Sequence, residues 1–298
     1  IAAFVATLAL TRRSLSLGVS ALLTVGYGYG ILRANFPDGF SHFMFDAAVA
    51  GLYLGHFLRR PTPAARARSR HAVFWLKVLS IIPVVLFFVP LQHPLVQLVG
   101  LRAAIFFLPL LVVGSRLDEG DLARLSRWVA VLNVVALGFG LAEFLFGVDR
   151  FSPQNVVTEL ISRSTDVGEG RAFRIPSTFP NAHAYGGTMV GTLPLLVGHW
   201  WALPRRSRQR RLMLLASAAS LTGVFMCGAR SPVVLLFALG LLTLLSGRLA
   251  VRHKLALGGL ALAIVVVVSL SDRFQRFTTL GDLDYVQALE QGMPPTGG

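Results

Sequence analysis

The chain has 298 residues, of which 54% are hydrophobic and only 14% are charged. Soluble domains of this length carry about 25% charged residues, so the composition excludes an ordinary water-soluble protein. The 28 Lys and Arg exceed the 14 Asp and Glu and give a net charge of +14, which taken alone suggests a nucleic-acid binder. The distribution excludes nucleic acid as a partner, because the basic residues stand in short clusters between apolar stretches of roughly membrane-spanning length.

Ten apolar segments follow one another and predict an all-α, polytopic transmembrane helix bundle of about ten spans. The first is only half a span long and the chain closes without a terminal element, so we expect a piece of a longer protein. We expect residues 1–271 to form the transmembrane domain and 272–298 to begin a truncated extracytoplasmic loop. The segments are 1–10, 14–32, 42–58, 72–89, 98–114, 128–148, 182–203, 212–227, 231–247 and 255–271.

The basic clusters predict the orientation of these spans. They hold 18 of the 28 Lys and Arg and fall in every second connection. Positive residues stay on the cytoplasmic side during insertion, so we expect these connections inside and the intervening ones outside. The clusters occupy 12–13, 59–70, 116–127, 205–211 and 248–254.

The longest internal outer connection, 149–179, is predicted to contain a short amphipathic helix. Ser152 and Pro153 suit a helix cap and first turn. Val156, Val157, Leu160 and Ile161 then fall on one helical face, which is typical of an element that lies along a membrane surface.

The stretch 171–187 is the richest in chemistry-bearing residues, because it brings two cations, hydroxyls, an amide and an imidazole to the start of a span. Pro176 and Pro180 should keep the approach non-helical, and the next residue along, an asparagine, should cap the span. Free N–H groups at a helix start and a nearby guanidinium both favour an anion such as phosphate. A purely structural alternative is that the arginine reaches lipid headgroups and the asparagine only caps. The candidate substrate-binding residues here are Arg171, Ser177, Asn181 and His183, beside Arg174.

A second cation stands at the start of a later outward-facing span. Arg230 and Ser231 precede Pro232, which suits the first turn of a helix. A lone arginine at a membrane boundary is usually an anchor, but together with Arg174 it could form one anion site.

Three further polar residues fall near the outer ends of spans. Glu143 and Asp46 are acids in apolar segments, where a charge is costly, so either could be a general base or an arginine partner. For Asp46 a water-exposed helix end is the simpler interpretation. Arg102 could line an outer cavity or anchor its helix.

These residues carry a resemblance to a known family. Arg174 with Ser177-Thr178-Phe179-Pro180-Asn181, and later Cys227-Gly228-Ala229-Arg230-Ser231, resembles the bacterial O-antigen ligase and O-antigen polymerase superfamily. The second motif departs from the commoner Thr-Gly-Ser-Arg turn. About twenty residues carry the specific resemblance, whereas the alternating topology fits over the whole chain.

The resemblance implies a GT-C-like architecture in the bacterial cytoplasmic (inner) membrane, with the active face extracytoplasmic. It implies a metal-independent, inverting glycosyltransferase without a cofactor, which moves a glycan from an undecaprenyl pyrophosphate carrier to a saccharide acceptor. Arg174 and Arg230 match the family's two catalytic arginines, and Arg102 and Glu143 join the substrate-binding candidates. The family also has a functional histidine in the loop after the span 255–271. Residues 271–298 contain none, so either the chain stops before that loop or the activity is absent.

A multi-span transporter or flippase for a lipid-linked or anionic substrate is the main alternative, and a non-catalytic membrane scaffold is a third. Transporters often show repeated halves and charges at mid-membrane depth. This sequence shows neither, and its outer charges cluster at the ends of the spans.

Overall fold

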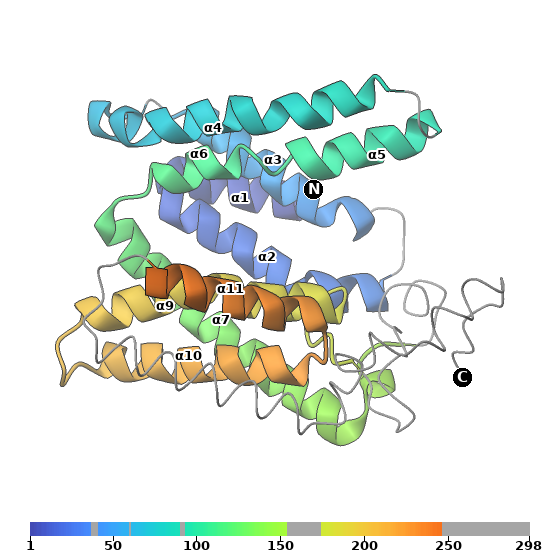
Figure 1. The fold of residues 1–298 in the computed structure, drawn as a ribbon, viewed down its shortest axis with the longest axis vertical. Helices are drawn as coiled ribbons and strands as arrows, with labels where there is room; N and C mark the ends of the chain where they lie inside the picture. Colours follow the sequence, from blue (N-terminus) through green and yellow to red (C-terminus); the bar gives the residue numbers. More distant parts are fainter. Residues whose placement is uncertain (37–40, 60, 90–92, 154–173, 246–298) are drawn as a thin grey trace. The chain divides into compact units, whose positions relative to one another are not determined.

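The computed structural model describes residues 1–36, 41–59, 61–89, 93–153 and 174–245, and over these ranges the chain is helical with no strand (Figure 1). The all-α prediction is confirmed for this part of the chain. The tenth predicted span, 255–271, and the amphipathic helix predicted within 149–179 lie outside the described residues, apart from the ends of the latter connection.

The other nine apolar segments are helical, except that the predicted span 98–114 is divided between α5 and α6 by a turn at 106–109. Their bounds are α1 Ala2–Arg13, α2 Leu15–Asn35, η1 Ser41–Phe43, α3 Met44–Phe57, α4 Pro63–Phe87, α5 Pro94–Ile105, α6 Leu110–Ser115, α7 Glu119–Phe146, η2 Val148–Arg150, α9 Ala182–Ala202, α10 Arg208–Met226 and α11 Arg230–Leu245.

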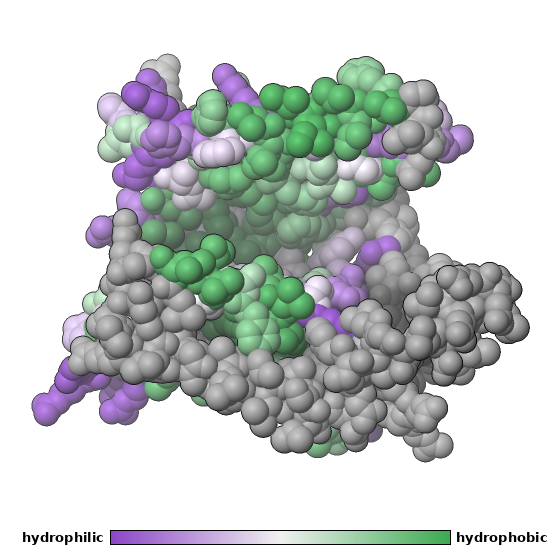
Figure 2. Space-filling model, in the orientation of Figure 1, coloured by the Kyte–Doolittle hydropathy of each residue, from purple (hydrophilic) through white to green (hydrophobic). Residues whose placement is uncertain are grey.

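Four helical segments are long and apolar enough to cross a membrane: Leu15–Asn35, Pro63–Phe87, Pro94–Ser115 and Glu119–Phe146. Two of them leave their apolar side chains exposed rather than packed, since only 6% of the window in α4 and 11% of that in α5–α6 is buried. Figure 2 shows hydrophobic residues along most of α4 and hydrophilic ones at its start. An apolar helix that is exposed on the protein suits a lipid surround, so the fold is that of a membrane-embedded protein.

The basic clusters, predicted as connections between spans, are partly helical. Thr62 Oγ1 accepts a hydrogen bond from Ala65 N–H at 3.2 Å, and Pro63 occupies the first turn, so α4 begins nine residues before the apolar segment. Asp118 Oδ1 accepts from Asp121 N–H at 2.7 Å and starts α7 in the same way. The helices therefore start earlier than the predicted spans 72–89 and 128–148, because hydropathy marks the apolar part of a helix and not its cap.

The chain forms two compact units. Unit 1 comprises Ile1–Val25 and Phe43–Trp128, and unit 2 comprises Gly26–His42 and Val129–Gly298. The division passes through α2 and α7, each of which contributes to both units.

In unit 1, small residues allow α1 and α3 to pack closely. A Cβ at Gly51 would overlap Phe4 O and Thr7 Oγ1, and one at Gly55 would stand 2.7 Å from Thr11 Cβ. Both threonines are fully buried, and Thr11 Oγ1 donates to Thr7 O at 2.6 Å within the helix. Glycines at i and i+4 that face small polar residues are a common helix-packing motif in membranes.

In unit 2, one asparagine links four helices. Asn133 on α7 accepts from Tyr27 Oη of α2 and donates through Nδ2 to Thr192 Oγ1 of α9 and Ser220 Oγ of α10, both at 2.8 Å. Asn133 and Ser220 are fully buried. Each of these amide, hydroxyl and phenol groups has a hydrogen-bond partner inside the unit. This Asn133 network therefore fixes the helix positions and leaves none of them unsatisfied.

The glycine contact in unit 1 yields a stability prediction. Replacing Gly51 with Val should lower the melting temperature of the detergent-purified protein, because the side chain overlaps α1; overpacking of this kind costs about 1–3 kcal/mol. Gly138→Val is the matched control, since a Cβ at Gly138 meets nothing within 4 Å. Equal melting temperatures for the two variants would contradict the close α1–α3 contact.

Candidate functional site

The segment 174–181 is a non-helical stretch that is largely buried within unit 2. Ile175, Ser177, Thr178 and Phe179 are all at least nine-tenths buried. Asn181 ends the segment and caps α9, because its Oδ1 accepts from Ala184 N–H at 2.8 Å. The predictions of a proline-held approach and an asparagine cap are therefore confirmed.

Helix α7 holds the middle of this segment. Glu143 is 2% exposed, and its Oε2 accepts from Ser177 N–H at 2.7 Å. Ser177 Oγ donates to Ala136 O at 2.6 Å, on the same helix. Ser177 has φ 53°, in the left-handed region that non-glycine residues rarely occupy, and such a conformation persists only where surrounding contacts over-determine it. The two bonds to α7 are those contacts.

Helix α2 holds the next residues. Gly30 N–H donates to Thr178 O at 3.0 Å, and a Cβ at Gly30 would overlap the Phe179 carbonyl. The ring of Tyr27, one turn earlier, lies 4.9 Å from that of Phe179. Glycine is thus required at position 30 for the backbone of segment 174–181 to approach the helix.

The turn between α10 and α11 holds the start of the segment. Ile175 N–H donates to Cys227 O at 3.3 Å. Gly228, with φ 67°, ends α10 and allows α11 to begin at Arg230 as predicted. Arg174 directly precedes the bonded isoleucine and Arg230 follows the bonded cysteine by three residues. One backbone hydrogen bond therefore joins the two arginine-bearing motifs.

His183 lies in the first turn of α9 and is exposed. Arg174 is close enough to interact electrostatically with it, and the arginine itself is only partly buried. The imidazole and the guanidinium thus occupy the same end of unit 2, where α2, α7 and α10 finish and α9 and α11 begin (Figure 1). We refer to this as the Asn181 end.

Several buried polar atoms at or near the Asn181 end have no hydrogen-bond partner among the described residues: Glu143 Oε1, Thr178 Oγ1, Tyr185 Oη and Arg33 Nε. Buried polar groups in proteins are normally paired, so such a set is typical of a polar site. Thr178, Tyr185 and Arg33 were not among the predicted site residues. Arg33, three residues from Gly30 on α2, could have been predicted as a further cation at the end of an apolar helix.

The remaining candidates lie elsewhere. Arg102 is in unit 1, where it forms an ion pair with Asp46, so that acid is an arginine partner. Arg171 lies outside the described residues. The structure therefore gathers Arg174, Ser177, Asn181, His183, Glu143 and Arg230 in unit 2, whereas Arg102 belongs to unit 1.

The fold and the site define a helical membrane protein with a buried irregular segment and cations at one end of a helical unit. No protein-family model, curated protein or solved structure matches the chain. The family resemblance accordingly depends on the motif residues themselves.

The Glu143 contact can be tested by stability. Glu143→Ala leaves Ser177 N–H without its acceptor, which should cost about 1–3 kcal/mol and lower the melting temperature of the purified protein by several degrees. Glu143→Gln retains a side-chain oxygen acceptor and should stay closer to the wild-type value. If the two variants melt together, the bond to Ser177 does not hold the segment.

Proposed function

We propose that the chain is a membrane glycosyltransferase of the O-antigen ligase or polymerase type, with about ten spans in a GT-C-like arrangement. It acts at the outer face of the bacterial cytoplasmic membrane. It transfers a glycan from an undecaprenyl pyrophosphate carrier to a saccharide acceptor in cell-surface polysaccharide biosynthesis.

The observation that carries this proposal is the hydrogen bond from Ile175 N–H to Cys227 O. The bonded residues are 52 positions apart in the sequence, yet this bond joins the two motifs that resemble the family at one end of unit 2. Arg230 is the first residue of α11, and Arg174 interacts electrostatically with His183 in the first turn of α9. At both helix starts the helix dipole also favours an anion.

The proposed glycosyl transfer needs a site that stabilises negative charge. As the acceptor hydroxyl attacks the anomeric carbon, the bond from that carbon to the pyrophosphate oxygen breaks, and its electron pair remains on the leaving pyrophosphate. The acceptor loses its proton to a base, and the attack from the opposite face inverts the anomeric centre. Two fixed guanidinium groups stabilise the charge on the leaving group, more strongly in a partly dry site than in water.

The Asn133 network favours this function over a transporter or flippase. A transport pathway needs polar groups that are available to substrate at mid-membrane depth. In unit 2, the polar groups around Asn133 bond to one another: both Nδ2 donor positions and Oδ1 of Asn133 are used. The polar atoms without described partners lie instead in or near the Asn181 end.

The test is to replace the arginines in the full-length protein. Arg174→Ala and Arg230→Ala should each lower glycan transfer from a lipid-linked donor by about 10²–10³-fold, because each removes a group that stabilises the leaving charge. Lys at either position should recover only part of the rate, since it loses the forked geometry of arginine. The measurement is transfer in membranes from a host that lacks the gene, with protein levels matched by immunoblot.

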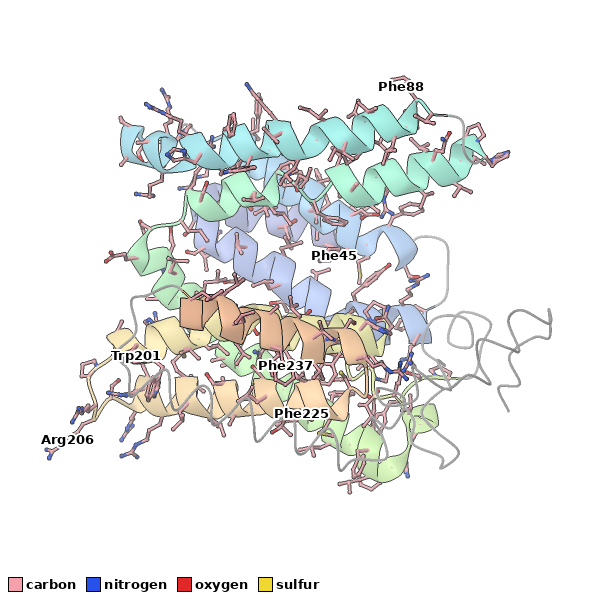
Figure 3. The ribbon with its side chains drawn as sticks, viewed as in Figure 1. Phe45, Phe88, Trp201, Arg206, Phe225 and Phe237 are labelled. Atoms are coloured by element: carbon pink, nitrogen blue, oxygen red, sulfur yellow. The ribbon has the colours of Figure 1, made fainter. Side chains whose placement is uncertain are left out.

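Arg150→Ala is the same-end control, because Arg150 is exposed and its described contact is with the Phe146 ring. Arg206→Ala, at the α9–α10 turn, is the opposite-end control (Figure 3). Wild-type glycan levels in both Arg174→Ala and Arg230→Ala would overturn the proposal. Movement of lipid or solute across liposomes without any glycosidic product would establish the transporter instead.

A further inference from the structure

A group of cations lies in unit 1, where α3, α4 and the connection before α7 contribute it. The guanidinium Nη1 of Arg116 lies 2.5 Å from His56 Nε2, and its Nε donates to the buried Ser69 Oγ at 3.3 Å. Arg68 donates to Arg116 O at 2.9 Å. Arg59 and Arg66 complete the group, because they interact electrostatically with His56 and Arg116 respectively. We call His56, Arg59, Arg66, Arg68 and Arg116 the Arg116 cluster.

The Arg116 cluster contains like charges without a described counter-charge. Among the residues that the structure describes, the ion pairs are Arg102–Asp46 and Arg124–Asp121, so none of the four arginines pairs with a carboxylate. Burial and the nearby Arg66 both lower the pKa of Arg116. Topology alone requires only that basic residues remain on one side of the membrane, and it does not require a partly buried arginine against a histidine. A bound anion would offset the repulsion.

Apolar side chains flank the cluster. Phe57 and Leu58, which stand between His56 and Arg59 in the sequence, are 85% and 57% exposed. Phe74 and Trp75 follow the basic start of α4 by about one turn and are also more than half exposed. In Figure 2 the hydrophilic start of α4 passes into its hydrophobic length. A free phosphate would leave this apolar surface uncovered. A lipid can place its headgroup against the cations and its acyl chains along the apolar helix.

We propose that the Arg116 cluster is a binding site for an anionic phospholipid of the leaflet at the basic end of unit 1. The headgroup phosphate contacts Arg66 and Arg116, and the acyl chains lie along the exposed apolar face of α4. This site is independent of the proposed glycosyltransferase activity, since it stands on residues of unit 1 alone.

The test compares lipids on the purified full-length protein. Native mass spectrometry and thermal unfolding are measured with added phosphatidylglycerol, phosphatidylcholine or inorganic phosphate. Phosphatidylglycerol should bind and raise the melting temperature, and the other two should not. The double variant Arg66→Gln/Arg116→Gln should weaken phosphatidylglycerol binding by about 25-fold, because each arginine near a charged lipid surface contributes roughly fivefold.

The matched control is Arg205→Gln/Arg206→Gln, which removes two exposed arginines from the α9–α10 turn and should change binding by less than about twofold. If replacing Arg116 impairs folding, Arg59→Gln/Arg66→Gln removes two cations of the Arg116 cluster without changing the contacts of Arg116 to His56 and Ser69. Equal weakening in the cluster variants and the control would show diffuse attraction and overturn the site. Stabilisation by inorganic phosphate or phosphatidylcholine equal to that by phosphatidylglycerol would also overturn it.

Discussion

The arrangement of unit 2 depends on one constraint: an irregular backbone inside a membrane bundle must find its hydrogen-bond partners within the protein. Segment 174–181 meets that constraint on three sides. Glu143 and the Ala136 carbonyl accept from Ser177, a backbone N–H of α2 donates to Thr178 O, and Cys227 O accepts from Ile175. Each partner belongs to a different part of the chain, so α2, α7 and the α10–α11 turn must converge around the segment before it can be buried.

This constraint also explains the costly features of the unit. A buried glutamate and a serine at positive φ would each destabilise the fold by themselves. Together they offset one another, because the Glu143 carboxyl group accepts a hydrogen bond from the Ser177 N–H that the unusual turn presents to α7. This bond and the one from Ile175 N–H to Cys227 O fix the backbone near Arg174 and Arg230. A guanidinium on a fixed backbone loses less conformational freedom when it binds an anion. Electrostatic catalysis depends on charged groups that are held in place in this way before the reaction.

Local features of the chain could be predicted, and contacts between distant segments could not. Hydropathy located nine of the ten apolar segments as helices, and side-chain chemistry identified the Asn181 cap and the start of α11 at Arg230. Gly30 contacts Phe179, almost 150 positions further along the chain. The residues near either position do not predict this contact. The ion pair between Arg102 and Asp46 could not be predicted either, since the hydropathy of two spans does not indicate which of their polar residues are in contact. Helix starts were misplaced where a cap such as Thr62 lies in a basic stretch, because hydropathy and capping are separate signals.

The two polar systems of unit 2 differ in a way that bears on function. The Asn133 network is closed, because its amide, hydroxyls and phenol satisfy one another across four helices, and a closed network specifies packing but offers nothing to a ligand. At the Asn181 end, buried oxygens of Glu143 and Thr178 have no partner among the described residues, and cations stand on the segments beside them. A polar atom that is buried without a partner costs free energy in every molecule of the protein. Several such atoms beside positive charge favour a polar ligand, so within unit 2 the Asn181 end is the part that suits the proposed site.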